Sequence, residues 1–165
     1  MCDVFGGTLP GMEMRTFDSF RDLFKLPGWQ ELIDAYAAES GNADLGDACP
    51  KASVYDSFDC AGLLRSIAVL DQGRVVGVLV MLLQDHPHFS KPVAHVDSIF
   101  LDKAHRRGAA GLRLVRRALD VARESGAAGC YFSAPEGSRL SRLFELLFKP
   151  TDRIFWASCE VTNGH

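Results

Sequence analysis

One stretch of the sequence decides the fold: AHVDSIFLDKAHRRGAAGLRLVRRALDVARE, residues 94–124. Its first part is an apolar, β-rich run that predicts a strand and contains Val96, Ile99, Phe100 and Leu101. A short loop at 106–111 follows, and a long amphipathic helical pattern begins directly after it. The order strand, small-residue loop, helix is typical of an α/β protein with a ligand at the loop.

The loop has the chemistry of an anion site. Small residues at 108–111 let the backbone turn tightly and approach a ligand. Free N–H groups in the first helical turn and the helix dipole favour negative charge there. Arg106 and Arg107 favour a phosphate, although spacing alone fits an ordinary glycine turn equally well. A P-loop is excluded because no Gly-Lys-Ser/Thr follows, and a dinucleotide fingerprint is excluded because GxGxxG is absent.

The loop and its flanks resemble the GCN5-related N-acetyltransferases (GNAT). The signature of that family is Arg or Gln, two residues, a small residue, any residue, then Gly or Ala. Here it reads Arg106-Arg107-Gly108-Ala109-Ala110-Gly111, with Ala109 where glycine is usual. It is preceded by Ile99-Phe100-Leu101 and followed by Leu112, Leu114 and Val115. The resemblance runs from Tyr55 to Trp156 and is to the shorter GNAT proteins of phages and bacteria.

This resemblance implies an α/β fold with a mixed, mostly antiparallel sheet of about six strands and roughly four helices. The sheet is expected to splay after the strand Pro92–Leu101 and form a V-shaped cleft. The implied activity is transfer of an acetyl group from acetyl-CoA to a primary amine of a small molecule or protein. Coenzyme A is expected to contact the strand end, the loop and the first helical turn: Ile99, Phe100, Leu101, Arg106, Arg107, Gly108, Ala109, Ala110, Gly111, Leu112 and Arg113.

The strand at 92–101 also carries two candidates for acid–base chemistry, His95 and Asp97. Because side chains alternate along a strand, both are expected on the face of Ile99 and Leu101. Burial of either side chain costs free energy unless the side chain has a polar partner or a role in function. The two could also simply pair with each other. The resemblance implies a base on this strand, since an amine must lose a proton before it attacks. An imidazole ordinarily titrates nearer neutral pH, whereas a carboxylate can also orient an ammonium, so we predict that Asp97 is required and His95 assists.

The acid that would protonate the departing thiolate is missing from its usual place. Many family members carry a tyrosine on the last helix, about five residues before a Gly-Phe pair. Here that count lands on Leu143, and Leu147 replaces the glycine. Ser138, Ser141 and Tyr131 remain as substitutes, of which Ser138 is included in the predicted catalytic set.

Composition indicates one domain, spanning residues 1–165. The chain is 47% hydrophobic and 24% charged, as in ordinary globular proteins. Its start lacks the basic and apolar segments of a signal peptide, and no apolar run is long enough to span a membrane. Five scattered cysteines, none spaced as CxxC, argue against disulfides and zinc and favour a reducing cytoplasm. Residues 1–60 hold 11 acidic and 4 basic side chains, a bias that fits a cationic amine substrate and an ordinary solvated surface equally well.

Periodicity predicts the remaining elements. Residues 1–14 are expected to form an irregular arm. Helical patterns occupy 17–24, 29–37 and 140–148, with a shorter one at 55–61. Strands are expected at 63–70 and 74–83, joined as a hairpin, and at 129–134 and 154–157. His86 and His88 lie in a loop with no third ligand at a recognisable spacing, so we predict no metal site.

Two other classes of function compete with acetyl transfer. One is a non-catalytic protein that binds coenzyme A as a regulator or inhibitor, a class that the missing tyrosine keeps open. The other is nucleic-acid binding through the arginines at 106–117, against which stand the net charge of −3 and the lack of a reading-helix motif. We therefore expect an amine acceptor as partner, neither nucleic acid nor membrane, and leave room for a homodimer.

Overall fold

The computed structural model describes residues 11–41, 45–46, 48–157 and 159. Within them a single sheet has the order β1-β2-β3-β4-β5. The strands are β1 (Met12–Phe17), β2 (Leu64–Asp71), β3 (Arg74–Asp85), β4 (Pro92–Leu101) and β5 (Cys130–Tyr131). β1 to β4 pair antiparallel, and β4 and β5 pair parallel. This confirms the mixed, mostly antiparallel α/β fold, although the described part has five strands rather than about six.

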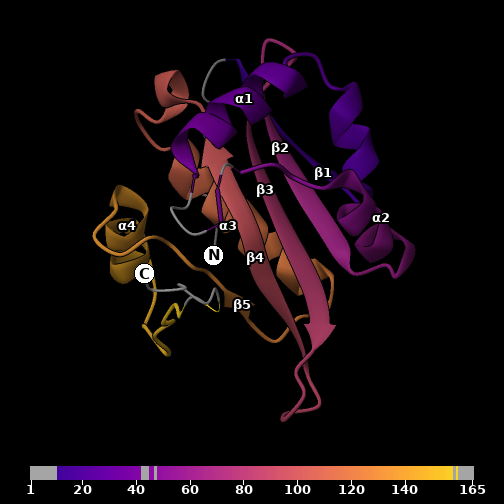
Figure 1. Cartoon of the computed structure of the whole chain (residues 1–165), viewed down its shortest axis with the longest axis vertical. Helices are drawn as coiled ribbons and strands as arrows, with labels where there is room; N and C mark the ends of the chain where they lie inside the picture. Colours follow the sequence, from indigo (N-terminus) through magenta and orange to yellow (C-terminus); the bar gives the residue numbers. More distant parts are fainter. Residues whose placement is uncertain (1–10, 42–44, 47, 158, 160–165) are drawn as a thin grey trace, which may run out of the picture.

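Helices cover both faces of this sheet (Figure 1). The α-helices are α1 (Trp29–Glu39), α2 (Ala52–Cys60), α3 (Ala110–Glu124) and α4 (Arg139–Leu147), and the 3-10 helices are η1 (Phe20–Lys25) and η2 (Lys103–His105). α3 packs on one face with its buried stripe Leu114, Val115, Ala118, Val121 and Ala122. η1, α1 and α2 lie on the other face. The four α-helices agree with the prediction, and none in the described residues is long and apolar enough to cross a membrane.

The hairpin of β2 and β3 forms as its sequence predicts. Asp71 pairs with Arg74, and both residues between them have positive φ, 47° for Gln72 and 79° for Gly73. A two-residue turn of this kind matches the twist of the strands that it joins. α1 and α4 also follow the helical spacing of their apolar residues.

Two predictions near the N-terminus are wrong. Residues 12–14 belong to β1 rather than to an irregular arm, because Met12 and Met14 pack on the α3 side and the strand pairs with β2. Residues 1–10 lie outside the described part. The helix expected at 17–24 is the short 3-10 helix η1, since Phe17 still belongs to β1.

Two predictions near the C-terminus are also wrong. Only Cys130 and Tyr131 of the strand expected at 129–134 pair with β4. Residues 154–157 have no regular structure, and Ile154 and Phe155 are each 85% exposed. A strand needs a partner for its backbone groups, and no backbone hydrogen bond joins Ile154 or Phe155 to a described residue.

Candidate active site

The sheet opens between β4 and β5. The two strands are paired only at Ala94–Cys130 and His95–Tyr131, whereas β4 continues to Leu101. Beyond His95, therefore, no described strand covers this edge of β4. The backbone groups of an uncovered edge are free to bind another chain or a ligand. This is the splay at the strand Pro92–Leu101 that the resemblance to the GNAT family implied.

A β-bulge at Asp97 sets the direction of the side chains. Val80 pairs with Ser98 and Met81 pairs with Val96, so that Asp97 is an extra residue in β4. Ala94 and Val96 before the bulge, and Ile99 and Leu101 after it, all pack on the α3 side. Asp97 points to the other face, where it contacts Tyr55 of α2, and His95, which lies between Ala94 and Val96, also points away from α3. The expectation that they share a face with Ile99 and Leu101 is therefore wrong, because the bulge interrupts the alternation on which it rested.

Tyr55 of α2 contacts Asp97. Its hydroxyl donates a hydrogen bond of 2.8 Å to Oδ2 of Asp97, and its ring stacks on Phe20 with centroids 4.1 Å apart. Burial and the negative charge of Asp97 raise the pKa of Tyr55 far above its usual range. Tyr55 therefore remains a hydrogen-bond donor at physiological pH. Asp97 itself is exposed, so its carboxylate stands open to solvent beside a permanent donor.

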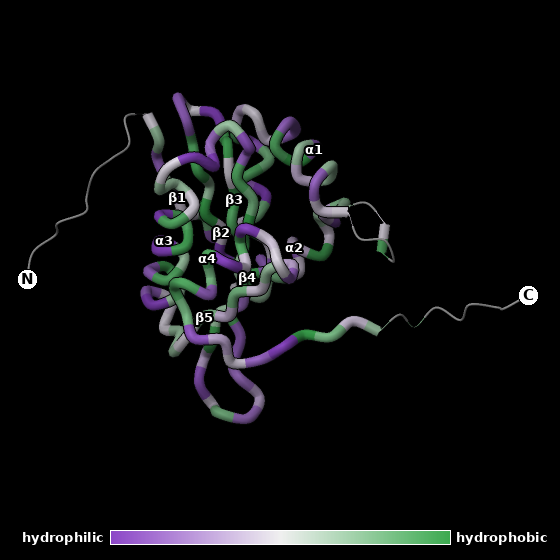
Figure 2. Tube along the Cα trace, turned by 90° about the vertical axis from the view of Figure 1, so that its left-hand side faces the viewer, coloured by the Kyte–Doolittle hydropathy of each residue, from purple (hydrophilic) through white to green (hydrophobic). Residues whose placement is uncertain are grey.

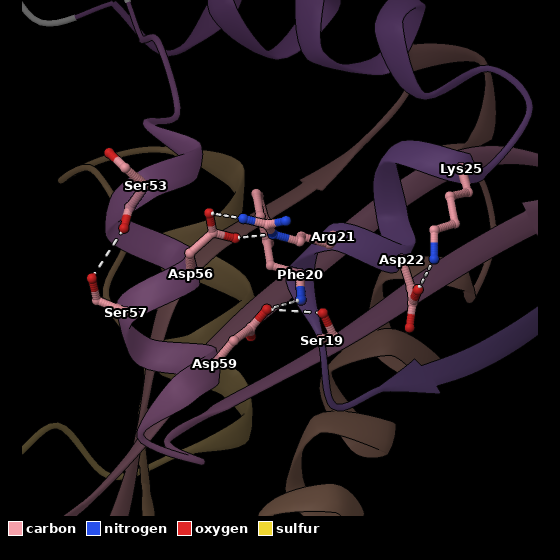
Figure 3. Close-up of polar contacts among 9 residues, drawn as sticks. All are labelled: Ser19, Phe20, Arg21, Asp22, Lys25, Ser53, Asp56, Ser57 and Asp59. Atoms are coloured by element: carbon pink, nitrogen blue, oxygen red, sulfur yellow. Dashed lines mark hydrogen bonds and ion pairs between the residues drawn. The ribbon is translucent and has the colours of Figure 1, made fainter.

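Polar contacts hold α2 in place (Figure 3). Arg21 of η1 donates two hydrogen bonds to Asp56, of 2.6 and 2.7 Å. Asp59 accepts from the Ser19 hydroxyl at 2.9 Å and from the backbone N–H of Phe20 at 2.8 Å. None of the residues of α2 is buried. The position of Tyr55 therefore depends on these contacts and on its own stacking against Phe20.

A second tyrosine lies on the same face. Tyr36 of α1 packs edge-on against Phe100 with ring centroids 5.5 Å apart. Burial, and to a lesser extent the charge of Asp97, raises its pKa as well. Asp97 thus lies among aromatic side chains that come from α1 and α2. Sequence reasoning missed both tyrosines, because no local pattern links either to Asp97.

His95 lies at a cavity between β4, β5 and α4. Its imidazole stacks on Tyr131 with centroids 4.7 Å apart and an interplanar angle of 21°. The cavity has a volume of about 670 Å³, and its lining includes His95, Tyr131, Ser141, Phe144, Glu145 and Asp152. Cys130 also lines it, but burial raises the pKa of that thiol to about 11. A protonated thiol is a poor nucleophile, which argues against an acyl-cysteine intermediate here.

Ser138 is the N-cap of α4. Its hydroxyl oxygen accepts the backbone N–H of Ser141 at 3.0 Å, a usual way to satisfy the first turn of a helix. Ser138 is not part of the cavity lining, whereas Ser141 and Tyr131 are. Of the three substitutes for the missing acid, therefore, only Tyr131 and Ser141 lie at the cavity.

The loop at 106–111, here called the anion loop, precedes α3 as predicted. Gly108 has a φ of 77°, which favours glycine, and α3 begins at Ala110 after the N-cap Ala109. No side chain caps the helix, so its first N–H groups remain available. A Cβ added at Gly111 would meet no atom within 4 Å. The start of α3 thus combines free donors with open space.

Arg106 has a structural role in this loop. Its guanidinium donates to both carboxylate oxygens of Glu39 at 2.8 and 3.0 Å and, through Nε, to the carbonyl oxygen of Leu101 at 2.6 Å. It also lies over the Phe100 ring, 5.1 Å from the centroid. Arg106 thus ties the loop to α1 and to the end of β4. The guanidinium groups of Arg107 and Arg113, by contrast, form no hydrogen bond or ion pair with any described residue.

The other residues predicted to bind the cofactor differ in how far they are buried. Phe100, Leu101 and Ala110 are buried, so that only their backbone groups can reach a ligand. Ile99 and Leu112 are partly buried, and Ala109 is exposed. His86 and His88 lie in the β3–β4 loop, and nowhere among the described residues do three His, Cys, Asp or Glu side chains form a group suited to a metal ion.

Comparison with known proteins assigns the chain to a family. Residues 29–145 match the model of the acetyltransferase (GNAT) family. A search of curated protein sequences finds no match.

Similar folds occur among solved structures. An aminoglycoside acetyltransferase from an uncultured soil metagenomic sample, in complex with sisomicin, is 18% identical, with a TM-score of 0.66 over 93% of this chain and 97% of that one. The aminoglycoside acetyltransferase AAC(6')-Iy, bound to a CoA bisubstrate analogue, is 16% identical, with a TM-score of 0.66 over 90% and 98%. A ribosomal-protein-alanine N-acetyltransferase from Brucella melitensis is 17% identical, with a TM-score of 0.65 over 88% and 98%. At such identities the likeness concerns the fold.

Proposed function

We propose, because this chain belongs to the acetyltransferase (GNAT) family, that it transfers an acetyl group from acetyl-CoA to a primary amine. One observation carries the proposal: β4 presents an uncovered edge next to the anion loop and, on the α1 and α2 face, a solvent-open carboxylate held by a tyrosine. The first feature suits the cofactor and the second suits an ammonium group. Both lie on one strand, so the two substrates can meet there.

Coenzyme A is the cofactor of this family, and acetyl-CoA supplies the acetyl group as an activated thioester. The backbone of residues 106–111 and the first turn of α3 suit its pyrophosphate. Arg107 and Arg113 are better placed to add charge than Arg106, which Glu39 already engages. Backbone N–H groups on the open edge of β4, from Val96 to Leu101, suit a thioester oxygen that gains negative charge.

Asp97 and His95 supply the acceptor side. Asp97 attracts and orients the ammonium, and the amine must then lose a proton because only the neutral form has a lone pair. Asp97 or His95 accepts that proton directly or through water. Tyr36 and Tyr55 come from the first 60 residues and the anion loop from the rest, which supports a division into an acceptor wall and a cofactor-binding part. The helices that carry these tyrosines and the helix that follows the anion loop all pack on the same sheet, which supports a single domain spanning 1–165.

The departing thiolate needs a proton donor. Tyr131 and Ser141 line the cavity beside His95 and are the better candidates. Ser138 remains a candidate, but its oxygen caps α4. If none of the three donates, the protein binds coenzyme A without rapid turnover, which is the regulatory alternative.

The acceptor is a small-molecule or protein amine. The aminoglycoside acetyltransferases and the ribosomal-protein-alanine acetyltransferase with this fold represent both kinds. Nucleic acid is disfavoured, because Arg106, Arg117 and Arg123 are each paired with a carboxylate. Cys49, Cys60, Cys130 and Cys159 are free thiols, which supports a reducing cytoplasm.

A thermal-shift assay tests the class of function. Acetyl-CoA and CoA should raise the melting temperature with increasing concentration, and oligonucleotides should not, since only a ligand of the native state stabilises by mass action. Release of free CoA thiol over a panel of amines then separates an enzyme from a regulator. Stabilisation by oligonucleotides alone would contradict the proposal.

Substitution of Gly111 tests the anion loop. Gly111→Val fills the open space at the start of α3 and should weaken acetyl-CoA binding about tenfold or more, roughly 1.4 kcal/mol. Gly111→Ala is the matched control, because its single methyl group leaves most of that space open. Calorimetric titration with acetyl-CoA measures both. Equal affinities in folded variants would remove Gly111 from the cofactor site.

Tyr55→Phe tests the link between α2 and Asp97. The variant keeps the stack on Phe20 and loses only the hydroxyl that donates to Asp97. We expect kcat/KM for the amine to fall roughly tenfold, mainly through KM, since a hydrogen bond to a charged group is worth about 1.5–3 kcal/mol. Tyr36→Phe, which keeps its packing on Phe100, is the control. An unchanged KM in Tyr55→Phe would exclude a positioning role.

A further inference from the structure

Glu39 is an acidic side chain at the end of a helix, where its charge is locally unfavourable. It is the last residue of α1, and the final turn of that helix contains no basic residue. The C-terminal end of a helix carries partial negative charge, so the helix dipole repels a carboxylate there. A residue that conflicts with its own helix in this way is expected to serve a contact elsewhere in the fold. For Glu39 that contact is the start of the anion loop.

Two cations from the segment between β4 and α3 converge on this carboxylate. Arg106 donates to its two oxygens at 2.8 and 3.0 Å, a two-pronged geometry that fixes both distance and direction. Nζ of Lys103 lies 3.5 Å from Oε1 of Glu39. The side chains of Glu39 and Arg106 are 26% and 33% exposed, so solvent screens this pair only in part. The hydrogen bonds from Arg106 hold the pKa of Glu39 below its usual range, and the carboxylate therefore stays ionised at neutral pH.

The Arg106 side chain also binds the end of β4. Its Nε donates to the carbonyl oxygen of Leu101 at 2.6 Å, and its guanidinium lies over the Phe100 ring, 5.1 Å from the centroid. Phe100 is buried and packs edge-on against Tyr36, one turn before Glu39 in α1. A single arginine side chain thus holds the end of β4 and the first residue of the anion loop against α1.

The rest of the anion loop has few contacts of its own. Arg107 and Gly108 form no backbone hydrogen bond with a described residue, and no side chain caps the start of α3. α1 and α3 lie on opposite faces of the sheet (Figure 2), so the contact of Glu39 with Arg106 reaches from the layer of α1 to the segment that enters α3. The position of the free donors at 107–109 therefore depends on the anchor at Arg106.

We propose that Glu39 is a positioning residue for the cofactor: through Arg106 it fixes the anion loop in the arrangement that binds the pyrophosphate of acetyl-CoA. The inference rests on the proposed function and adds a residue of α1, on the acceptor face of the sheet, to the cofactor site. A loop that is fixed before the ligand arrives loses less conformational freedom on binding, and the affinity is higher for that reason.

The alternative role for Glu39 is to withhold Arg106 from the phosphate. Removal of the carboxylate would then free a cation and tighten binding. The contacts of Arg106 favour positioning, because the guanidinium would have to leave Glu39, the Leu101 carbonyl and the Phe100 ring to reach a phosphate. The two roles predict changes in affinity of opposite sign.

Calorimetric titration of the full chain with acetyl-CoA tests the inference. Glu39→Gln keeps the shape of the side chain, removes its charge and should weaken binding about tenfold. Glu31→Gln is the matched control: it removes the same charge from the same helix, at an exposed pair with Arg74, and should leave the affinity unchanged. Arg106→Lys keeps the positive charge but cannot contact Glu39 and Leu101 together, so it should weaken binding about as much as Glu39→Gln.

Two further measurements separate positioning from a general loss of structure. In Glu39→Gln the KM for acetyl-CoA should rise, whereas kcat at saturating acetyl-CoA and the KM for the amine should stay unchanged. Nuclear magnetic relaxation of the ligand-free protein should show lower backbone order at residues 107–109 in Glu39→Gln than in the wild type. The second measurement needs no cofactor and no acceptor.

Three results would overturn the inference, and they can be told apart. A wild type that binds no acetyl-CoA would contradict the proposed function and with it any role of Glu39 toward the cofactor. If the wild type binds, equal or tighter binding by Glu39→Gln would exclude positioning. A joint change of kcat, the KM for the amine and the melting temperature in Glu39→Gln would show that Glu39 serves the fold as a whole.

Discussion

Replacement of Asp97 by asparagine should lower turnover of an acceptor amine by about a hundredfold or more, while the affinity for acetyl-CoA stays nearly unchanged. Asparagine keeps the size of the side chain and an oxygen that can accept from Tyr55, but it removes the negative charge and the proton-accepting group. A loss of a hundredfold corresponds to about 2.7 kcal/mol of transition-state stabilisation. Asp97 is exposed at the bulge of β4, so the substitution should leave the core intact.

The measurement is kcat and KM for an identified amine, with acetyl-CoA affinity measured separately. Asp85→Asn is a matched control, because Asp85 is also exposed and lies at the far end of β3. Full activity of Asp97→Asn would show that the carboxylate is not required. In that case His95→Gln would test the remaining candidate base, with a fall in kcat at unchanged acetyl-CoA affinity as the expected result. The double variant of Asp97→Asn with Tyr55→Phe should lose no more than Asp97→Asn alone, because the two groups act as a unit.

Gly77→Val should destabilise the fold by about 3 kcal/mol, close to a hundredfold in the unfolding equilibrium. A Cβ at Gly77 would lie 2.6 Å from Cδ1 of Leu101, 3.1 Å from the carbonyl oxygen of Phe100 and 3.3 Å from Cβ of Val69. The Leu101 methyl group could move, but the Phe100 carbonyl belongs to the paired backbone of β4. Valine adds two further methyl groups to this crowded position.

Urea unfolding monitored by tryptophan fluorescence measures the loss, since Trp29 is buried in the core. Gly111→Ala serves as the control, because a Cβ there meets no atom within 4 Å. An unchanged midpoint for Gly77→Val would contradict the close approach of β3 and β4 at this position.

Local sequence patterns predicted those elements whose cause is local. The 3.6-residue period of apolar side chains at 112–122 is sufficient for α3, because every helix hydrogen bond is made within the segment. Gln72-Gly73 between two β-rich runs similarly predicts the β2–β3 hairpin. The loop at 106–111 could be recognised because small residues, arginines and a following helix are adjacent in the chain. These features also carried the resemblance to the GNAT family.

The errors arise where a long-range partner decides the structure. β1 forms because residues 12–17 pair with β2, 49 to 59 residues away in the chain, although glycines and a proline before it suggested an irregular arm. Residues 154–157 have a strand composition, yet Ile154 and Phe155 form no backbone hydrogen bond with a described residue. The backbone groups of a strand need hydrogen bonds from a neighbouring strand. A segment with strand-favouring residues therefore forms a strand only where the fold places such a neighbour beside it.

By itself, therefore, the sequence determined the α/β class, the hairpin, the long helices and the position of the anion loop. Only the tertiary structure decided how the site is assembled. The bulge at Asp97 turns that carboxylate to the face of α2, where Tyr55, 42 residues away in sequence, donates to it. Glu39, 67 residues from Arg106, forms an ion pair with this arginine, which the loop sequence alone had predicted to bind phosphate. Hydrogen bonds and ion pairs act over about 3 Å in space, and which distant side chains come that close depends on how the sheet and helices pack.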